Sequence, residues 1–208
     1  DGLLERRLFD GGTFGPAELV TPIPNGVQSV EMAATPGRRS FVFTTTAGTG
    51  SVFEQLSPPL WNVPTNTLSL DTQNVDLKAV MFGEDLHDAF VFRRISDGFV
   101  EAKAWNPFTM QTMTSAGVPT DEYDVAPFGA GALLAWSSAG SIHLALVTRG
   151  PAAITMSDVA LEDGGLSFGN GGQGSFPRLT VEGTEVRLAW QEEAFAGAGY
   201  QVFGLVIR

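Results

Sequence analysis

A short apolar motif recurs four times along the chain. A large apolar residue, then Val or Ala, then an aromatic residue follow one another directly, as Phe-Val-Phe at 41–43 and 90–92 and as Leu-Ala-Trp at 134–136 and 188–190. The aromatic residues that end the four copies stand roughly 44–54 positions apart. About 40–50 residues is the length of one β-propeller blade. The motif therefore predicts a chain built from repeated β-sheet units.

The flanks of each copy repeat as well. An apolar stretch precedes the motif at 30–34, 77–82, 123–128 and 176–181, and another follows a glycine-containing turn at 52–56, 99–105, 142–147 and 200–207. Weaker fourth strands fit 67–70, 111–114 and 154–159. Four short strands joined by turns make one blade. No apolar period of 3.6 residues persists over 11 or more residues, so essentially no helix is expected.

We therefore predict an all-β fold, a β-propeller of four recognisable four-stranded repeats within a single domain. The repeats cover about 26–70, 71–120, 121–170 and 171–208. A β-sandwich with coincidental spacing is the alternative. The run Ala-Leu-Leu-Ala-Trp at 132–136 is apolar at every position, so we expect both faces of this second strand to be covered.

The two ends of the chain leave the number of blades open at four or five, or as part of a larger ring. Residues 1–25 supply a third-type strand at 3–9 and a fourth-type strand at 17–21, and the last repeat stops after its third strand. Either 17–21 completes the last blade, or the missing strands come from another segment or another copy. Because proteins avoid bare strand edges, we expect this edge to be occupied, by a protein partner or in a homo-oligomer.

Composition and charge narrow the possible partners. The chain has 208 residues with 25 Gly, 12 Pro and no Cys, and 23 acidic against 12 basic residues give a net charge of −11. Nucleic acid and anionic membranes both require a basic face, so neither is an expected partner. No run of 18 apolar residues exists that could span a membrane. Without Cys there is no disulfide, thiolate zinc site or cysteine nucleophile.

One segment carries a family resemblance. The sequence Phe-Pro-Arg-Leu-Thr-Val-Glu-Gly at 176–183, followed by Val-Arg-Leu-Ala-Trp at 186–190, resembles blades of bacterial exported β-propeller repeat proteins. These are similar in general form to sialidase-like and lectin-like propellers. The resemblance implies a secreted, periplasmic or cell-surface protein. Sialidase blades carry a Ser-x-Asp-x-Gly-x-Thr-Trp turn, which Ser96-Asp97-Gly98 with the distant Trp105 does not match, so sialidase chemistry is not implied.

The motifs that could carry catalysis or metal binding have simpler interpretations. A Gly-x-Gly-x-x-Gly run at 169–174 leads into a strand rather than a helix, so we interpret it as a loop between blades. The acidic cluster with one His at 84–88 could bind a divalent cation, but a solvated turn is our interpretation. We predict no catalytic residue, no metal and no cofactor. Two converging carboxylates, as in glycoside hydrolases, stay possible because the chain has 23 acidic residues.

Four residues are candidates for ligand contacts. Trp61 and Asn62 follow a Pro-Pro pair, where a large side chain is commonly presented at a surface. Asp121 and Tyr123 lie at the start of a predicted strand, where loops carry ligands. Trp136 and Trp190 belong to the repeated motif and are expected in the core. The predicted function is a non-catalytic propeller scaffold that binds a protein partner or joins a surface assembly; a carbohydrate-binding propeller and a glycoside hydrolase-type propeller are the alternatives.

Overall fold

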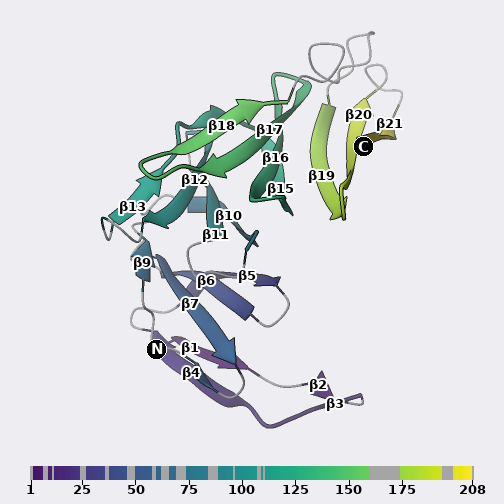
Figure 1. The fold of residues 1–208 in the computed structure, drawn as a ribbon. Coiled ribbons are helices and arrows are strands. Elements are labelled where there is room, and N and C mark those ends of the chain that lie inside the picture. Colours follow the sequence, from purple (N-terminus) through teal and green to yellow (C-terminus); the bar gives the residue numbers. More distant parts are fainter. Residues whose placement is uncertain are drawn as a thin grey trace. The chain divides into compact units, whose positions relative to one another are not determined.

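All regular elements in the described part of the chain are β-strands. The computed structural model (Figure 1) describes residues 2–6, 9–10, 12–23, 27–35, 38–45, 50–57, 60–61, 66–68, 74–83, 89–95, 97–106, 109, 111–159, 174–193 and 199–207. The chain divides into two compact units, Asp1–Asn74 and Val75–Arg208, and each is described by itself.

The described residues of the first unit form three antiparallel sheets. Two are two-stranded, β1 with β4 and β2 with β3; in the third, the order is β5-β6-β7-β8, and β9 also pairs with β7. The strands are β1 (Gly2–Arg6), β2 (Phe9–Asp10), β3 (Thr13–Phe14), β4 (Glu18–Ile23), β5 (Val27–Thr35), β6 (Arg38–Thr45), β7 (Gly50–Ser57), β8 (Leu60–Trp61) and β9 (Asn66–Leu68).

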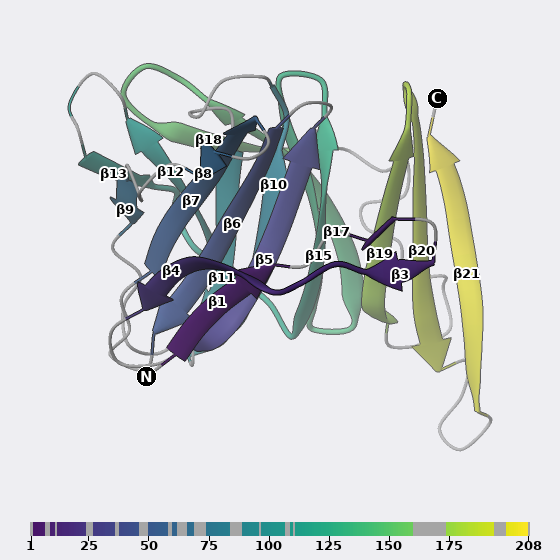
Figure 2. The same cartoon turned by 90° about the horizontal axis from the view of Figure 1, so that it is seen from below.

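The second unit contains three sheets of strands that are consecutive in sequence (Figures 1 and 2). In sheet β10–β14 the order is β10-β11-β12-β13 with β14 also on β12; sheets β15–β18 and β19–β21 follow the order of the chain. The strands are β10 (Asn74–Met81, whose first residue belongs to the first unit), β11 (Ala89–Ile95), β12 (Phe99–Asn106), β13 (Gln111–Thr114), β14 (Val118–Pro119), β15 (Glu122–Phe128), β16 (Gly131–Ser138), β17 (Ser141–Arg149), β18 (Ile154–Asp158), β19 (Gly174–Glu182), β20 (Glu185–Glu193) and β21 (Tyr200–Ile207).

The all-β prediction is confirmed. Each apolar stretch on either side of the repeated motif coincides with a strand, and the predicted terminal strands at 3–9 and 17–21 overlap β1 and β4, which pair. The limits of the repeats, the number of blades and the closure of a ring stay predictions.

Two apolar clusters join the three sheets of the second unit. β16 is apolar on both faces, as its sequence predicts. Leu134 and Trp136 pack into the cluster shared with sheet β10–β14, whereas Leu133 and Ala135 pack into the cluster shared with sheet β19–β21. Sheet β15–β18 is therefore the middle layer of this unit, and its burial fixes the spacing of the sheets on either side.

The copies of the apolar motif do not all point the same way. Phe90 and Phe92 on β11 lie in the same cluster as Leu134 and Trp136, so they face the following sheet, whereas Leu134 and Trp136 face the preceding one. Side chains alternate between the two faces of a strand, so a shift of one residue reverses every side chain. The motif thus indicates a buried second strand, but it does not determine which neighbouring sheet its large side chains face.

The same backbone hydrogen bond joins both pairs of neighbouring sheets. Thr120 donates its N–H to the carbonyl of Gly98 at 2.7 Å, and Gly174 donates to the carbonyl of Gly140 at 2.8 Å. Both acceptors are turn glycines with a positive φ, +84° at Gly98 and +81° at Gly140, a conformation that glycine adopts at little cost. Each second-to-third-strand turn therefore also anchors the start of the next sheet.

Candidate functional site

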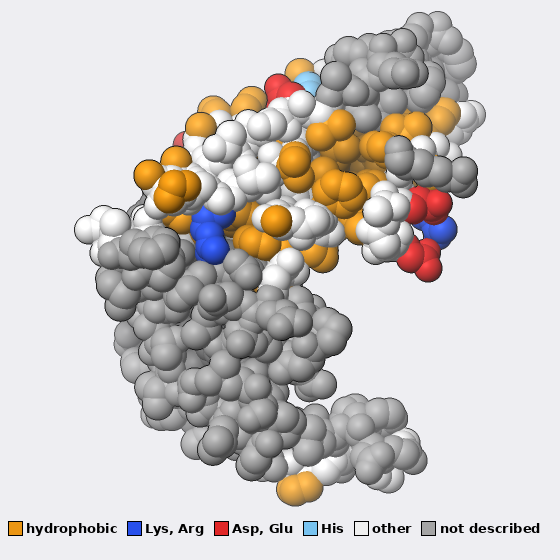
Figure 3. Space-filling model, viewed as in Figure 1, with side chains coloured by type: hydrophobic (Ala, Val, Ile, Leu, Met, Phe, Trp, Pro, Cys, Tyr) orange, Lys and Arg blue, Asp and Glu red, His pale blue; other side chains and the backbone are white. Residues whose placement is uncertain are grey.

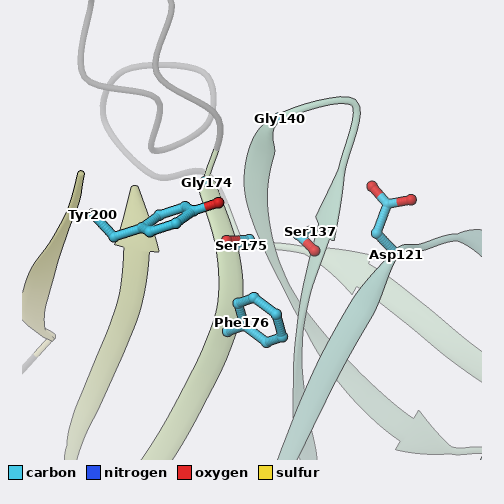
Figure 4. Close-up of a pocket in the computed structure, with 7 residues that line it drawn as sticks. All are labelled: Asp121, Ser137, Gly140, Gly174, Ser175, Phe176 and Tyr200. Carbon is cyan, nitrogen blue, oxygen red and sulfur yellow. The ribbon is translucent and has the colours of Figure 1, made fainter. Parts of the chain in front are cut away.

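A pocket of about 240 Å³ lies between sheets β15–β18 and β19–β21, beside the second of these anchoring bonds. Figure 4 shows its residues on both sides of the gap. The described residues that line it are Asp121, Ser137, Gly140, Gly174, Ser175, Phe176 and Tyr200. They combine two aromatic rings, three hydroxyls including that of Tyr200, and one carboxylate.

The pocket is open because small residues meet at this junction. Ser137 and Gly140 come from the middle sheet, and Gly174 and Ser175 from the next one. At the preceding junction the corresponding place holds a long side chain, because Arg94 on β11 donates from Nη1 to the carbonyl of Asp121, directly after the anchoring Thr120. The two junctions between sheets share the same anchoring backbone hydrogen bond but differ in the side chains beside that bond.

Phe176 is held in the pocket by an unusual backbone. Its φ is +52°, a left-handed value that costs a residue with a side chain of this size about 1–2 kcal/mol. The pairing of β19 with β20 shifts register between Ser175 and Arg178, which marks a β-bulge at this point. The ring is 47% exposed although the next residue, Pro177, is fully buried. The bulge therefore presents an aromatic ring to solvent in the middle of a packed strand.

Tyr200 supplies the second aromatic ring. It is the first residue of β21, follows Gly199 with a φ of +84°, and is 64% exposed. Figure 4 shows both rings on the β19–β21 side of the gap, with Ser137 and Asp121 on the β15–β16 side. An aromatic ring offers an apolar face, and the phenol adds a hydroxyl that donates and accepts hydrogen bonds.

The polar groups of the pocket are positioned by the sheets themselves. Ser137 Oγ accepts from the N–H of Glu122 at 3.2 Å and its hydroxyl lies 3.4 Å from the carbonyl of the same residue. Ser175 donates its hydroxyl to the carbonyl of Gln191 at 3.5 Å, a long contact that leaves oxygen lone pairs for a ligand. Asp121 is exposed, and its backbone N–H donates to the carbonyl of Ser137 at 2.9 Å.

The four predicted ligand-binding residues fall in different places. Asp121 lines the pocket. Tyr123 is 1% exposed, donates its hydroxyl to the carbonyl of Phe92 at 3.3 Å, and has Lys78 Nζ 5.6 Å from its ring centroid. Trp61 ends β8, and nothing is described of its side chain; Asn62 lies outside the described residues. The assignment of these four residues to ligand binding stays a prediction.

The other sequence features are placed as follows. Trp136 and Trp190 are core residues, 6% and 2% exposed, and Trp136 stacks on His143 with ring centroids 5.0 Å apart. The acidic cluster at 84–88 and the glycine-rich run before Gly174 lie outside the described residues. Among the residues that are described, no three His, Asp or Glu side chains gather as a metal site, and no helix is long and apolar enough to cross a membrane.

The fold of the chain is similar to solved propeller structures. One is the SapL1 lectin in complex with alpha methyl fucoside, with a TM-score of 0.57, 11% identity and coverage of 100% of this chain and 74% of that chain. The chain has a propeller-type fold. This likeness establishes the fold alone. No protein-family model matches the sequence, and the comparison with curated proteins finds no match.

Two glycoside hydrolases are more distant in structure. A thermostable family-43 glycoside hydrolase gives a TM-score of 0.38 at 7% identity over 86% of this chain and 68% of that chain. The GH93 alpha-L-arabinofuranosidase of Fusarium graminearum with arabinobiose gives 0.44 at 10% identity over 86% and 62%. With TM-scores below 0.5, these two matches carry no argument about this chain.

Proposed function

We propose that the chain is a carbohydrate-binding propeller and that a sugar binds in the pocket between sheets β15–β18 and β19–β21. The observation that carries this proposal is the pairing of two exposed aromatic rings, Phe176 and Tyr200, with hydroxyl and carboxylate groups in one pocket. A sugar ring has an apolar C–H face and an edge of hydroxyls. The aromatic faces cover the first, and oxygen acceptors and donors bind the second.

The conformation of Phe176 supports a role in binding rather than in folding. Its ring is half exposed, so it contributes little to the core, yet its backbone is strained. Strained residues persist where the surrounding structure enforces them, and they gather at ligand sites. Phe176 is thus only partly buried and keeps a strained backbone. A ligand that contacts its ring would explain both.

The size of the pocket favours one sugar residue. Pockets for drug-sized ligands have volumes of about 300–1,000 Å³, and this pocket has about 240 Å³. A single terminal monosaccharide therefore suits it better than a long chain. The lectin with a similar fold was solved with alpha methyl fucoside, which makes this glycoside the first ligand to test.

Binding is favoured over hydrolysis by the carboxylates of the pocket. Glycoside hydrolases use a pair of carboxyl groups about 5–9.5 Å apart. Among the described residues that line this pocket, one carries a carboxylate, Asp121. The glycoside hydrolase alternative would need a second acid from outside this lining.

The finer architecture is part of the proposal. The sheets are taken as blades of a propeller with four recognisable repeats, to which β1 and β4 add the third and fourth strands of a further blade. A propeller that binds sugars suits a secreted, periplasmic or cell-surface protein. The antiparallel order of the strands within each sheet supports this assignment.

Replacing Tyr200 tests the proposed site. We expect Tyr200→Ala to weaken sugar binding about tenfold, because the ring's contact contributes about 0.5–1.5 kcal/mol beyond its buried area, the covered apolar area adds to this, and about 1.4 kcal/mol is tenfold. The fold should be unaffected, since Tyr200 is 64% exposed. The measurement is isothermal titration calorimetry with alpha methyl fucoside, preceded by a multivalent glycan array to find the preferred sugar.

Phe99→Ala is the matched control. It also removes a solvent-exposed aromatic ring, from a residue that is 39% exposed and is not among the described residues that line the pocket. It should leave sugar affinity unchanged. The proposed function is abandoned if no glycan binds the unmodified chain, or if Tyr200→Ala binds as tightly as Tyr200.

A further inference from the structure

Among the described strands, none pairs with the outer edge of β21, whereas the corresponding edge is covered in the two preceding sheets. In those sheets the third strand, β12 or β17, is covered by an antiparallel fourth strand, β13 or β18. Within the described part of the chain β21 pairs with β20 alone. Figure 2 shows β21 as the last strand of its sheet. One row of its backbone N–H and C=O groups therefore has no partner strand among the described residues.

The side chains of β21 do not protect this edge. Val202 is 80% exposed and Val206 is 49% exposed, on the same face as Gly204 between them. No charged residue occurs between Tyr200 and Ile207. Natural edge strands are commonly protected by lysines, prolines or inward-pointing charges. A neutral eight-residue edge with exposed valines is instead suited to pairing.

We propose that β21 pairs antiparallel with β21 of a second copy, about a two-fold axis at Gly204. In this register Val202 lies opposite Val206 of the second copy, and Phe203 lies opposite Leu205. Apolar residues thus lie opposite apolar residues on both faces of the joined sheet, although the two strands have the same sequence. A two-fold interface requires this kind of self-complementarity.

The charges of sheet β19–β21 are compatible with this occupant. Arg187 donates from Nε to Glu185 Oε1 at 2.7 Å and lies 3.4 Å from Glu182 Oε2. Figure 3 shows acidic side chains beside a basic one at one end of the part of the molecule formed by sheet β19–β21. A two-fold axis brings like charges together wherever they lie near it. Here the strand at the axis is neutral and the charged group is on other strands.

The proposal does not rest on sugar binding, although the two sites are adjacent. Tyr200 begins β21 and also lines the pocket, so each dimer would carry one pocket near each end of the paired strands. Two linked sites raise the avidity for a multivalent surface without any new contact to the sugar.

Charge substitutions in the 208-residue chain test the register. Sedimentation velocity from about 1 μM to about 1 mM should show a monomer–dimer equilibrium. Because Val202 and Val206 are both exposed, their replacement should leave the fold intact. Val202→Lys combined with Val206→Lys places like charges opposite each other and should weaken dimerisation more than tenfold. Val202→Glu combined with Val206→Lys places opposite charges together twice and should restore it.

A matched control and a cross-link complete the test. Thr155→Lys combined with Thr180→Lys adds the same two charges at exposed sites on β18 and β19 and should not alter the dimer. Gly204→Cys introduces the first cysteine of the chain and should give a covalent dimer on oxidation. A monomer at every concentration overturns the proposal, as does a dimer that the double-lysine variant leaves unchanged. If the protein is monomeric and the amides of β21 are protected from hydrogen exchange, another strand of the same chain pairs with this edge, which also overturns the proposal.

Discussion

Phe176 links backbone strain to the proposed binding site. Its left-handed φ of +52° is unfavourable for a bulky side chain, while its ring is only about half buried. Glycine adopts the same φ without the clash of a Cβ atom. A substitution at this position can therefore change the affinity of the site without lowering the stability of the fold.

We expect Phe176→Gly to weaken sugar binding at least tenfold without lowering the free energy of unfolding. Removing the strain contributes about 1–2 kcal/mol, which offsets the small burial that is lost and the greater freedom of glycine in the unfolded chain. Urea denaturation measures the stability and calorimetry the affinity. Phe176→Ala is the comparison, because it removes the ring but keeps the Cβ clash. If the glycine variant is much less stable than the alanine variant, the strain argument fails.

At the residue scale, the sequence predicts Asp121 as a contact residue because acidic residues at the start of a strand are visible in a pattern, and Asp121 lines the pocket. Its role in ligand binding stays a prediction. The pattern places Phe176 within a strand, because a β-bulge that turns one residue outward leaves no trace in the alternation of apolar positions. It likewise places Tyr200 in an apolar strand. Which ends of two sheets meet depends on tertiary packing, so the pocket could not be predicted from local sequence.

At the scale of elements, the junction between sheets β15–β18 and β19–β21 depends on close approach. A Cβ atom on Gly174 would lie 2.9 Å from Cγ1 of Ile142, which is fully buried. The same glycine donates the anchoring hydrogen bond to Gly140 at 2.8 Å. The start of β19 is thus held against the middle sheet with no room for a side chain.

We expect Gly174→Ala to lower the free energy of unfolding by about 1–3 kcal/mol, the usual cost of overpacking a dense core. Gly117→Ala is the control, since the nearest atom to its added Cβ is 3.4 Å away and its residue is exposed. The control should stay within about 0.5 kcal/mol of the unmodified chain. Thermal and urea denaturation of both variants provide the comparison, and equal stability of the two would contradict a tight junction.

The elements themselves were largely predictable. Strands alternate or run apolar over five to nine residues, and glycines mark their turns, so the local pattern located β5 to β7, β10 to β12, β15 to β17 and β19 to β21. The direction in which each strand faces was not predictable from the motif. Phe92 and Trp136 occupy the same place in the motif, but their side chains enter one cluster from opposite sheets. Only the packed structure sets that register.

At the scale of the whole molecule, net charge opposes the association that β21 favours. The chain carries a net charge of −11, so two copies repel each other at long range while their neutral strands attract at contact. Salt screens the first effect, since the Debye length falls from about 30 Å at 0.01 M to about 8 Å at 0.15 M. Apolar contacts and backbone hydrogen bonds are not weakened by this screening. The balance between the repulsion of the two acidic copies and the attraction of their β21 strands therefore depends on ionic strength.

We expect the dimer to tighten roughly threefold to tenfold between 0.01 M and 0.15 M salt, because screening removes repulsion between acidic copies. Sedimentation at matched protein concentrations measures the change. The Val202→Glu, Val206→Lys variant should respond less or in the opposite direction, since its interface contains ion pairs that salt weakens. Affinity for alpha methyl fucoside, an uncharged ligand, should stay the same. A dimer of the unmodified chain that weakens with salt would require charged contacts, and the neutral β21 strand offers none.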